Sequence, residues 1–225
     1  MIRVSVADPR LIARHYQETR ERIIALVTGL DDATRSTAVP ACPNWSVRDV
    51  VAHLTAVAED WARGRLAGPP TDEETAAQIA RFRDCDVAEI LAAWTDAAAQ
   101  LDRLAESTGL KPPLGDITSH EHDIRGATGR PGARESAAVW YASDQLLVNL
   151  RTPAPLLVTV EDAKYRCGPE GRTEIRLRTT RFEALRWRTG RRSHAQLVAM
   201  DWSGDPGAVL DHLYLFGPAD AEIIE

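Results

Sequence analysis

The chain has 225 residues, 44% hydrophobic and 27% charged, which is enough for one large domain or two small ones that each bury a core. Its net charge of −6 excludes a nucleic-acid partner held by domain-wide phosphate neutralisation. It has no run of the roughly 20 apolar residues that a membrane helix needs, and its N-terminus lacks the apolar core of a signal peptide, so we expect a cytoplasmic protein without a membrane partner.

Helical periodicity dominates the first 130 or so residues. Ser46 and Asp49 form an S-x-x-D helix start, and the preceding stretch Pro40–Trp45 is predicted to be a turn. Four principal helices with short connections predict an antiparallel bundle. Apolar residues at intervals of three and four predict helices over Asp8–Leu30, from Ser46 to the break at Gly68, over Thr71–Asp84 and Asp86–Ser107, and after Pro113.

The pattern changes after Arg134. A helix over Ser136–Leu150 is followed by three segments with strand character, PLLVTVEDAKYR, TEIRLRTT and RFEALRWRTG, with a turn at GPEGR. Two short helices, around His194–Met200 and over Pro206–Phe216, complete a small α+β module. We therefore predict an α+β protein with domains at 1–150 and 151–225. The boundary falls between residues 130 and 155, because the Ser136 helix could belong to either half.

Three polar residues of the bundle could bind a metal. Asp116 and His120 are four residues apart, so on a helix they share one face, and His53 lies among the apolar positions of its own helix. Imidazole and carboxylate suit a zinc-like ion, and three protein ligands leave a fourth position open, as in catalytic sites. Asp123 is placed to accept a hydrogen bond from the His120 ring. The alternative is that the HEHD segment is a solvated helix surface and His53 a packed core histidine.

The three cysteines, Cys42, Cys85 and Cys167, are far apart and include no CxxC pair, so no disulfide framework or cysteine zinc cluster is indicated. We expect buried or incidental thiols. Cys42 lies just before the helix that carries His53.

Three segments resemble one family in the expected order: NWSVRDVVAHL at 44–54, DITSHEHDIRGATGRP at 116–131 and RTGRRSHAQLVAMDWSGDP at 188–206. Together they resemble the mycothiol-dependent maleylpyruvate isomerase family of actinobacteria. The resemblance implies a DinB-like metal-binding four-helix bundle followed by a small α+β domain similar to sterol carrier proteins. It also implies that His53, Asp116 and His120 bind a divalent metal. The isomerase itself is expected to have glutamate where this chain has Asp116. Aspartate can also bind zinc, so this difference weakens the expectation of the isomerase reaction more than the expectation of a bound metal.

By this resemblance, the partners are a small-molecule substrate and the low-molecular-weight thiol mycothiol, which would occupy the open metal position. Zinc, the expected metal, would lower the pKa of that thiol. The resulting thiolate would add to the double bond of a small unsaturated carboxylic acid, as an isomerase requires, or displace a leaving group, as in a thiol transferase. A guanidinium pairs well with a carboxylate, so Arg191 and Arg192 are the candidate catalytic residues that contact substrate, and Arg125 is another candidate.

Two other functions stay open. The chain could be a non-catalytic metal- or ligand-binding module, although such a module has no physical reason to keep a complete ligand triad. It could also be a metal-dependent hydrolase with Glu121 or Glu59 as general base. Nickel, iron and manganese would suit the same ligands as zinc.

Overall fold

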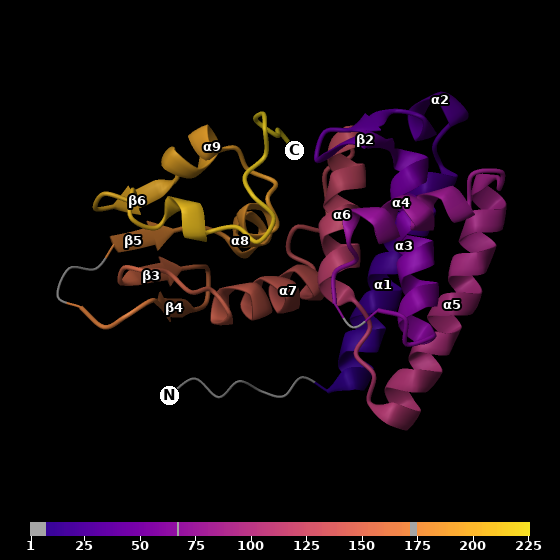
Figure 1. Ribbon diagram of the computed structural model, residues 1–225, viewed down its shortest axis with the longest axis horizontal. Helices are drawn as coiled ribbons and strands as arrows, with labels where there is room; N and C mark the ends of the chain where they lie inside the picture. Colours follow the sequence, from indigo (N-terminus) through magenta and orange to yellow (C-terminus); the bar gives the residue numbers. More distant parts are fainter. Residues whose placement is uncertain (1–7, 67, 172–174) are drawn as a thin grey trace. The chain divides into compact units, whose positions relative to one another are not determined.

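The computed structural model describes residues 8–66, 68–171 and 175–225 and has mixed α+β architecture, as predicted (Figure 1). The chain divides between Arg130 and Pro131 into two compact units. This division groups the Ser136 helix with the second unit, whereas a boundary after residue 150 groups it with the first. The N-terminal residues 1–7, Arg172 of the predicted GPEGR turn and the first two residues of the predicted TEIRLRTT strand lie outside the described residues.

The first unit is built on a four-helix bundle, as predicted. Helices α1 and α3 each pack against both α5 and α6, so the four helices form a closed ring around a common core (Figure 1). Trp94, Ile23, Val50 and Ile117 are fully buried in this unit. The bundle helices are α1 (Pro9–Thr28), α3 (Val47–Ala62), α5 (Val87–Thr108) and α6 (Leu114–Ala127), and the connections contain the short helices α2 (Asp32–Arg35) and α4 (Asp72–Arg81).

The start of α3 is fixed locally. Ser46 accepts a hydrogen bond from the backbone N–H of Asp49, and the Asp49 carboxylate accepts one from the backbone N–H of Ser46, which confirms the predicted capping box. The same reciprocal arrangement starts α4 and α5. Each cap is worth about 1 kcal/mol. The caps therefore set the first residue of α3 and with it the position of His53.

The predicted turn over Pro40–Trp45 is wrong in detail. Cys42–Ser46 forms strand β2, which pairs antiparallel with β1 (Ala38–Val39) through the partners Ala38↔Ser46 and Val39↔Cys42. The sequence signal of two prolines and an asparagine favours a turn, but a tertiary contact decides the result, because β1 packs against α6 and β2 against α3. The small sheet therefore spans the two helices that carry the candidate metal ligands.

A buried charge cluster attaches α4 to α3. Asp60 accepts hydrogen bonds from both Arg81 Nη2 (3.1 and 3.0 Å) and Gln78 Nε2 (3.1 Å). Burial acts to raise the pKa of Asp60, but these hydrogen bonds and the charges of Arg81 and Arg65 overcome it and hold the pKa below its ordinary value of 3.8. Asp60 is therefore ionised at neutral pH.

The second unit combines helices with a mixed four-stranded sheet of order β4-β3-β5-β6. Strand β3 is antiparallel to β4 and parallel to β5, and β5 is antiparallel to β6. Leu156, Val158, Leu177 and Trp187 lie in its core. Its elements are α7 (Ala137–Val148), β3 (Leu156–Thr159), β4 (Lys164–Cys167), β5 (Ile175–Arg178), α8 (Arg181–Arg188), α9 (His194–Val198), β6 (Asp201–Ser203) and the 3-10 turn η1 (Leu210–His212).

Two predicted elements of this unit are wrong, and a third is confirmed with an added turn. PLLVTVEDAKYR has the predicted strand character, but it is a hairpin of two strands, closed by the hydrogen bond from Val160 N–H to the Ala163 carbonyl. RFEALRWRTG is the helix α8, started by a hydrogen bond from Glu183 N–H to the Thr180 hydroxyl. The predicted helix Pro206–Phe216 contains only η1, since Gly207 is a poor helix former and its N–H is bonded to the Asp205 side chain.

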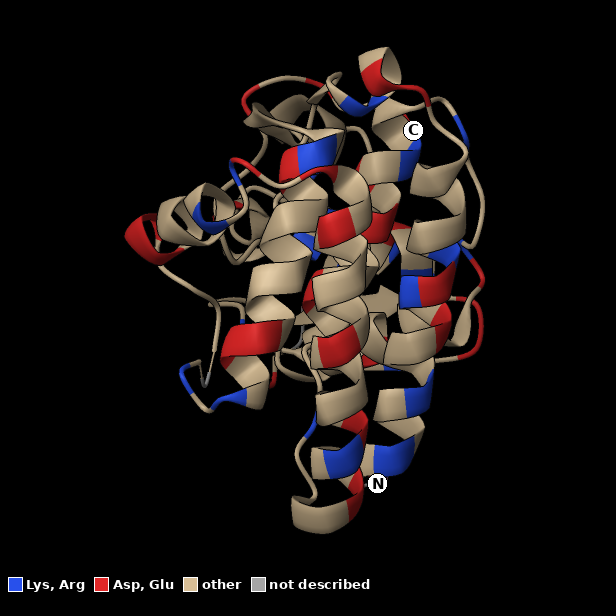
Figure 2. Cartoon of the chain, turned by 90° about the vertical axis from the view of Figure 1, so that its right-hand side faces the viewer, with Lys and Arg blue, Asp and Glu red and all other residues tan. Residues whose placement is uncertain are grey.

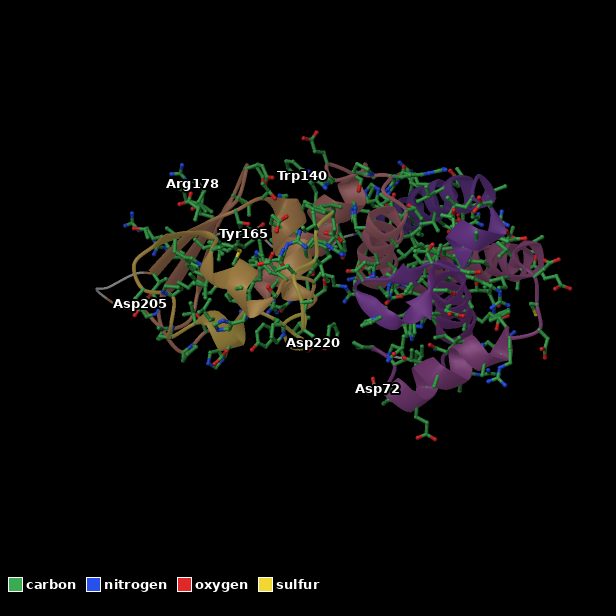
Figure 3. All side chains as sticks on the ribbon, turned by 90° about the horizontal axis from the view of Figure 1, so that it is seen from above. Asp72, Trp140, Tyr165, Arg178, Asp205 and Asp220 are labelled. Atoms are coloured by element: carbon green, nitrogen blue, oxygen red, sulfur yellow. The ribbon has the colours of Figure 1, made fainter. Side chains whose placement is uncertain are left out.

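Arg181 organises polar contacts within the second unit. Its guanidinium donates to Asp162 (2.8 and 3.1 Å) and to the Tyr165 hydroxyl (3.1 Å), and lies 4.9 Å from the centre of the Trp140 ring. Tyr165 and Trp140 are labelled in Figure 3. Burial raises the pKa of Tyr165 to about 12, a hydrogen bond to Asp144 adds to the increase, and Arg181 opposes it. Tyr165 is therefore neutral at physiological pH.

Surface charge of both signs is interspersed along the bundle helices that face the viewer in Figure 2. Among the described residues, no helix combines the length and apolar character needed to cross a membrane.

Candidate metal centre

The predicted ligands converge from two helices of the first unit. His53 lies on α3, and Asp116 and His120 lie one turn apart on α6. Oδ1 of Asp116 is 3.7 Å from Nε2 of His53 and 3.6 Å from Nε2 of His120. Ligand atoms bound about 2.1 Å from a tetrahedral ion lie roughly 3.4 Å from one another. Both distances to Asp116 are therefore within a few tenths of an ångström of the spacing that a metal would require.

Burial distinguishes this arrangement from ordinary core packing. His53 is 3% exposed, and its Nδ1 is buried with no hydrogen-bond partner among the described residues. Its Nε2 is too far from Asp116 for a hydrogen bond. A buried polar atom without a partner costs about 1–3 kcal/mol, so His53 is not the hydrogen-bonded core histidine of the alternative interpretation. Two imidazoles and one carboxylate are a donor set that fits a divalent ion.

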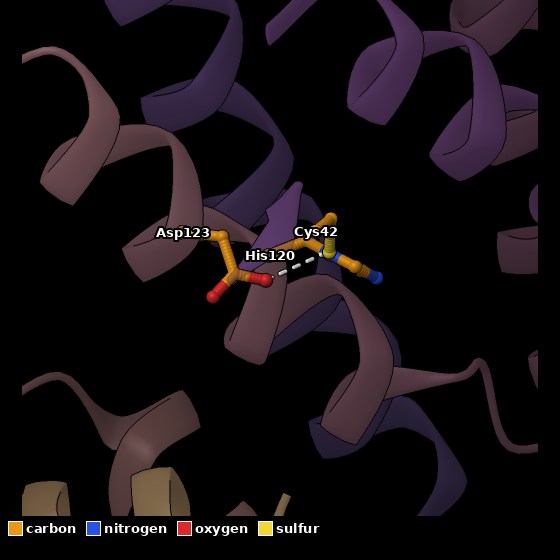
Figure 4. Close-up of side chains that lie close together, drawn as sticks. All are labelled: Cys42, His120 and Asp123. Atoms are coloured by element: carbon orange, nitrogen blue, oxygen red, sulfur yellow. Dashed lines mark ion pairs between the residues drawn. The ribbon is translucent and has the colours of Figure 1, made fainter. Parts of the chain in front are cut away.

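Asp123 supports His120 from the other side of its ring. Oδ2 of Asp123 lies 2.9 Å from Nδ1 of His120, as the dashed line in Figure 4 shows, and the Asp123 side chain is fully buried. The contact is an ion-pair contact rather than a regular hydrogen bond. Asp123 therefore stands where a group that orients a ligand histidine would stand.

Trp45 forms an aromatic wall beside both histidines. Its ring centre lies 5.0 Å from that of His53 and 6.0 Å from that of His120, and the two imidazoles lie 5.1 Å apart. Offset and edge contacts at these distances are favourable and restrict rotation of each ring. The sequence analysis did not assign Trp45 to the site. Its signals in the sequence were its position directly before the Ser46 cap and its place in the NWSVRDVVAHL segment, but the predicted turn over Pro40–Trp45 gave no reason to place its side chain beside the histidines.

Tyr16 on α1 is a second residue that the sequence did not assign to the site. Its hydroxyl accepts a hydrogen bond from Nε1 of Trp94 (3.0 Å), and the side chain is buried. Burial raises the pKa of Tyr16 above its ordinary value, the Trp94 hydrogen bond opposes this, and the charge of Asp116 adds to the increase. Tyr16 is therefore a neutral hydroxyl within the field of the candidate carboxylate ligand.

Neither carboxylate proposed as a hydrolytic base is available as one. Glu121 is fully buried and accepts hydrogen bonds from Arg22 (2.8 and 2.7 Å) and Arg125 (3.1 and 3.0 Å). Glu59 pairs with Arg81 at 2.8 Å. Both carboxylates therefore already accept hydrogen bonds from arginines. The pair with Glu121 also holds the guanidinium of Arg125, which was a candidate for contacting substrate.

The arginines predicted to contact substrate belong to the second unit. Arg192 is 7% exposed and donates to Glu183 (2.8 and 2.7 Å) and to Glu225 (3.1 Å). Arg191 donates to the Thr189 carbonyl at 2.6 Å. Because the metal ligands belong to the other unit, the substrate role of both arginines stays a prediction.

Comparisons with known proteins bear on the fold and the family. The pattern of the mycothiol maleylpyruvate isomerase N-terminal domain matches residues 16–138, more than half of the chain. The chain is similar to the crystal structure of the mycothiol-dependent maleylpyruvate isomerase, with 13% identity and a TM-score of 0.53 over 82% of this chain and 90% of that one. A histidine-to-alanine mutant of that enzyme gives 12% identity and a TM-score of 0.52 over the same shares. No curated protein matches the chain significantly.

Proposed function

Because this chain belongs to the family of the mycothiol maleylpyruvate isomerase N-terminal domain, we propose that it is a thiol-dependent metalloenzyme, either an isomerase or a thiol transferase. The observation that carries the proposal is the convergence of two imidazole nitrogens and one carboxylate oxygen from two helices, at 3.6–3.7 Å. Three such ligands leave room for one further ligand on a tetrahedral ion, which is the arrangement of a catalytic rather than a structural site.

A bound divalent ion would supply Lewis acidity, lowering the pKa of a coordinated thiol so that it reacts as a thiolate. The protein residues supply position. Nε2 of His53 and Nε2 of His120 both lie near Oδ1 of Asp116, Asp123 lies beside the other nitrogen of His120, and Trp45 packs beside both imidazoles. Asp116 is 29% exposed, and the two histidines are nearly inaccessible. The thiol would therefore approach from the side on which Asp116 meets solvent.

Mycothiol is the proposed thiol, and a small unsaturated carboxylic acid the proposed substrate class. Addition of a thiolate to the double bond leaves a single bond that can rotate, and elimination then returns the thiol and the isomerised acid. If the adduct is not eliminated, the same addition is a thiol transfer. Arg191 and Arg192 remain the proposed contacts for the substrate carboxylate. Asp116 is one methylene shorter than the glutamate expected in the isomerase. We therefore propose thiolate addition in general, rather than the isomerisation of maleylpyruvate in particular.

The test is turnover of maleylpyruvate and related unsaturated acids with zinc-loaded protein, with and without mycothiol. We expect product only when metal and thiol are both present, and none from His53→Ala. His194→Ala is the matched control, because His194 is exposed at the start of α9. Equal turnover without thiol, or unchanged turnover in His53→Ala, would refute the proposal. A protein that binds no metal would be the non-catalytic module instead.

A further inference from the structure

A second group of metal-binding side chains lies next to the first and shares His120 with it. Sγ of Cys42, a ring nitrogen of His120 and a carboxylate oxygen of Asp123 all lie within 4.8 Å of one another (Figure 4). Cys42 comes from β2, and its pairing with Val39 places it there. Cys42 is half-buried and both other members are buried, so the group is reachable from solvent on the cysteine side.

The two nitrogens of His120 face different groups. Nε2 lies 3.6 Å from Asp116, and Nδ1 lies 2.9 Å from Asp123 and is buried without a regular hydrogen bond. A neutral imidazole has one nitrogen with a lone pair and one with a proton. The ring can therefore bind an ion through Nε2, beside Asp116, or through Nδ1, beside Asp123.

We propose that Cys42, His120 and Asp123 form a second, thiolate-containing cation position that is occupied in place of the first. One thiolate and one carboxylate neutralise a divalent ion completely, whereas the His53 set supplies one negative charge. Thiolate ligands select soft ions such as Zn²⁺ or Cd²⁺ over harder ones. Ligand atoms around such an ion lie roughly 3.3–3.7 Å apart, so side-chain shifts of about 1 Å from the present spacing would close the site. The proposal rests on this geometry and does not require the proposed catalytic activity.

Cadmium titration of the full-length protein tests the proposal, because a thiolate bound to Cd²⁺ gives a charge-transfer absorption in the ultraviolet. We expect the band to saturate at one Cd²⁺ per chain and to disappear in Cys42→Ser and His120→Ala. It should persist in Cys85→Ser, the matched thiol control, which belongs to neither ligand group. It should also persist in His53→Ala, which removes only the first position.

Three results would overturn the proposal. A band that survives in Cys42→Ser would come from another thiol, and a band lost in His53→Ala would mean that Cys42 only completes the first site. Two Cd²⁺ ions bound per chain would show that the positions are not alternatives. If Cys42→Ser fails to fold, alkylation of Cys42 in folded Cys85→Ser protein gives the same test. We expect the band to vanish there, and its persistence would refute the proposal.

Discussion

Glu121 should be one of the most important residues for the stability of the first unit. Its carboxylate is fully buried and joins α6 to α1 through Arg22, with Arg125 completing the cluster from its own helix. Glu121→Ala removes four N–H···O contacts and leaves two guanidinium groups without their carboxylate. We therefore expect a large loss of stability.

The magnitude follows from burial. Removing one partner of a buried ion pair costs about 3–5 kcal/mol. Arg22 and Arg125 are 28% and 16% exposed, so each can regain some hydration in the variant. We therefore expect a loss near the lower end, about 3 kcal/mol, in the free energy of unfolding, which corresponds to a Tm lower by about 9 °C. Glu121→Gln keeps the volume and some hydrogen bonds and should lose less.

The assay is thermal and urea unfolding followed by circular dichroism, with Asp32→Asn as the matched control in the same unit. Asp32 also pairs with an arginine, at 2.7 Å, but it is 96% exposed, and exposed pairs contribute about 0–1 kcal/mol. A loss below about 1 kcal/mol for Glu121→Ala, similar to the control, would refute the argument that this cluster fastens α6 to α1.

Four further outcomes follow. Asp123→Asn should weaken metal binding about 10- to 100-fold in competition with a chelator, and unchanged affinity would deny it a supporting role. Arg192→Ala should unfold at lower temperature because Glu183 loses its arginine and Glu225 keeps only Arg186, and a higher Michaelis constant measured while the variant is folded would show the predicted contact with substrate. Because the pKa of folded Asp60 lies below 3.8, its stabilising contribution is complete above that pH and is lost as the pH falls through the folded value, so Asp60→Asn should flatten the acid side of the stability profile. Cys167 is 4% exposed and burial raises its pKa to about 11, so a thiol reagent at pH 7 should modify it only after unfolding.

Local signals were sufficient to predict the bundle and the helices that carry the candidate metal ligands. The Ser46 capping box specifies where α3 begins, and helical spacing then places His53 on the buried face. The interval of four places Asp116 and His120 together, since α6 is a regular helix. The spacing of residues along the sequence could not predict that α3 lies close to α6, because this contact depends on packing across the bundle.

Elements formed by contacts distant in sequence were missed. Nearly every residue of α8 is buried, because Arg181, Arg186 and Arg188 bond to groups on other segments: Asp162, Glu225 and the Leu213 carbonyl. Because these arginines are buried, polar and apolar residues do not separate onto two faces of α8, and the segment lacks the apolar period of an amphipathic helix. The remaining alternation of charged and apolar residues resembled a strand. Strand β2 was also missed because its pairing and packing depend on contacts distant in sequence. The positions of Trp45 and Cys42 beside the histidines were missed with it.

The most direct test of the account is the metal content of purified, zinc-loaded protein, measured by elemental analysis in a Cys42→Ser background so that only the first position can bind. We predict about one ion per chain, lost when His53→Ala or His120→Ala is added and retained when His194→Ala is added. Absence of metal from the Cys42→Ser protein, with none taken up on adding zinc, would contradict the central claim that His53, Asp116 and His120 form a metal centre.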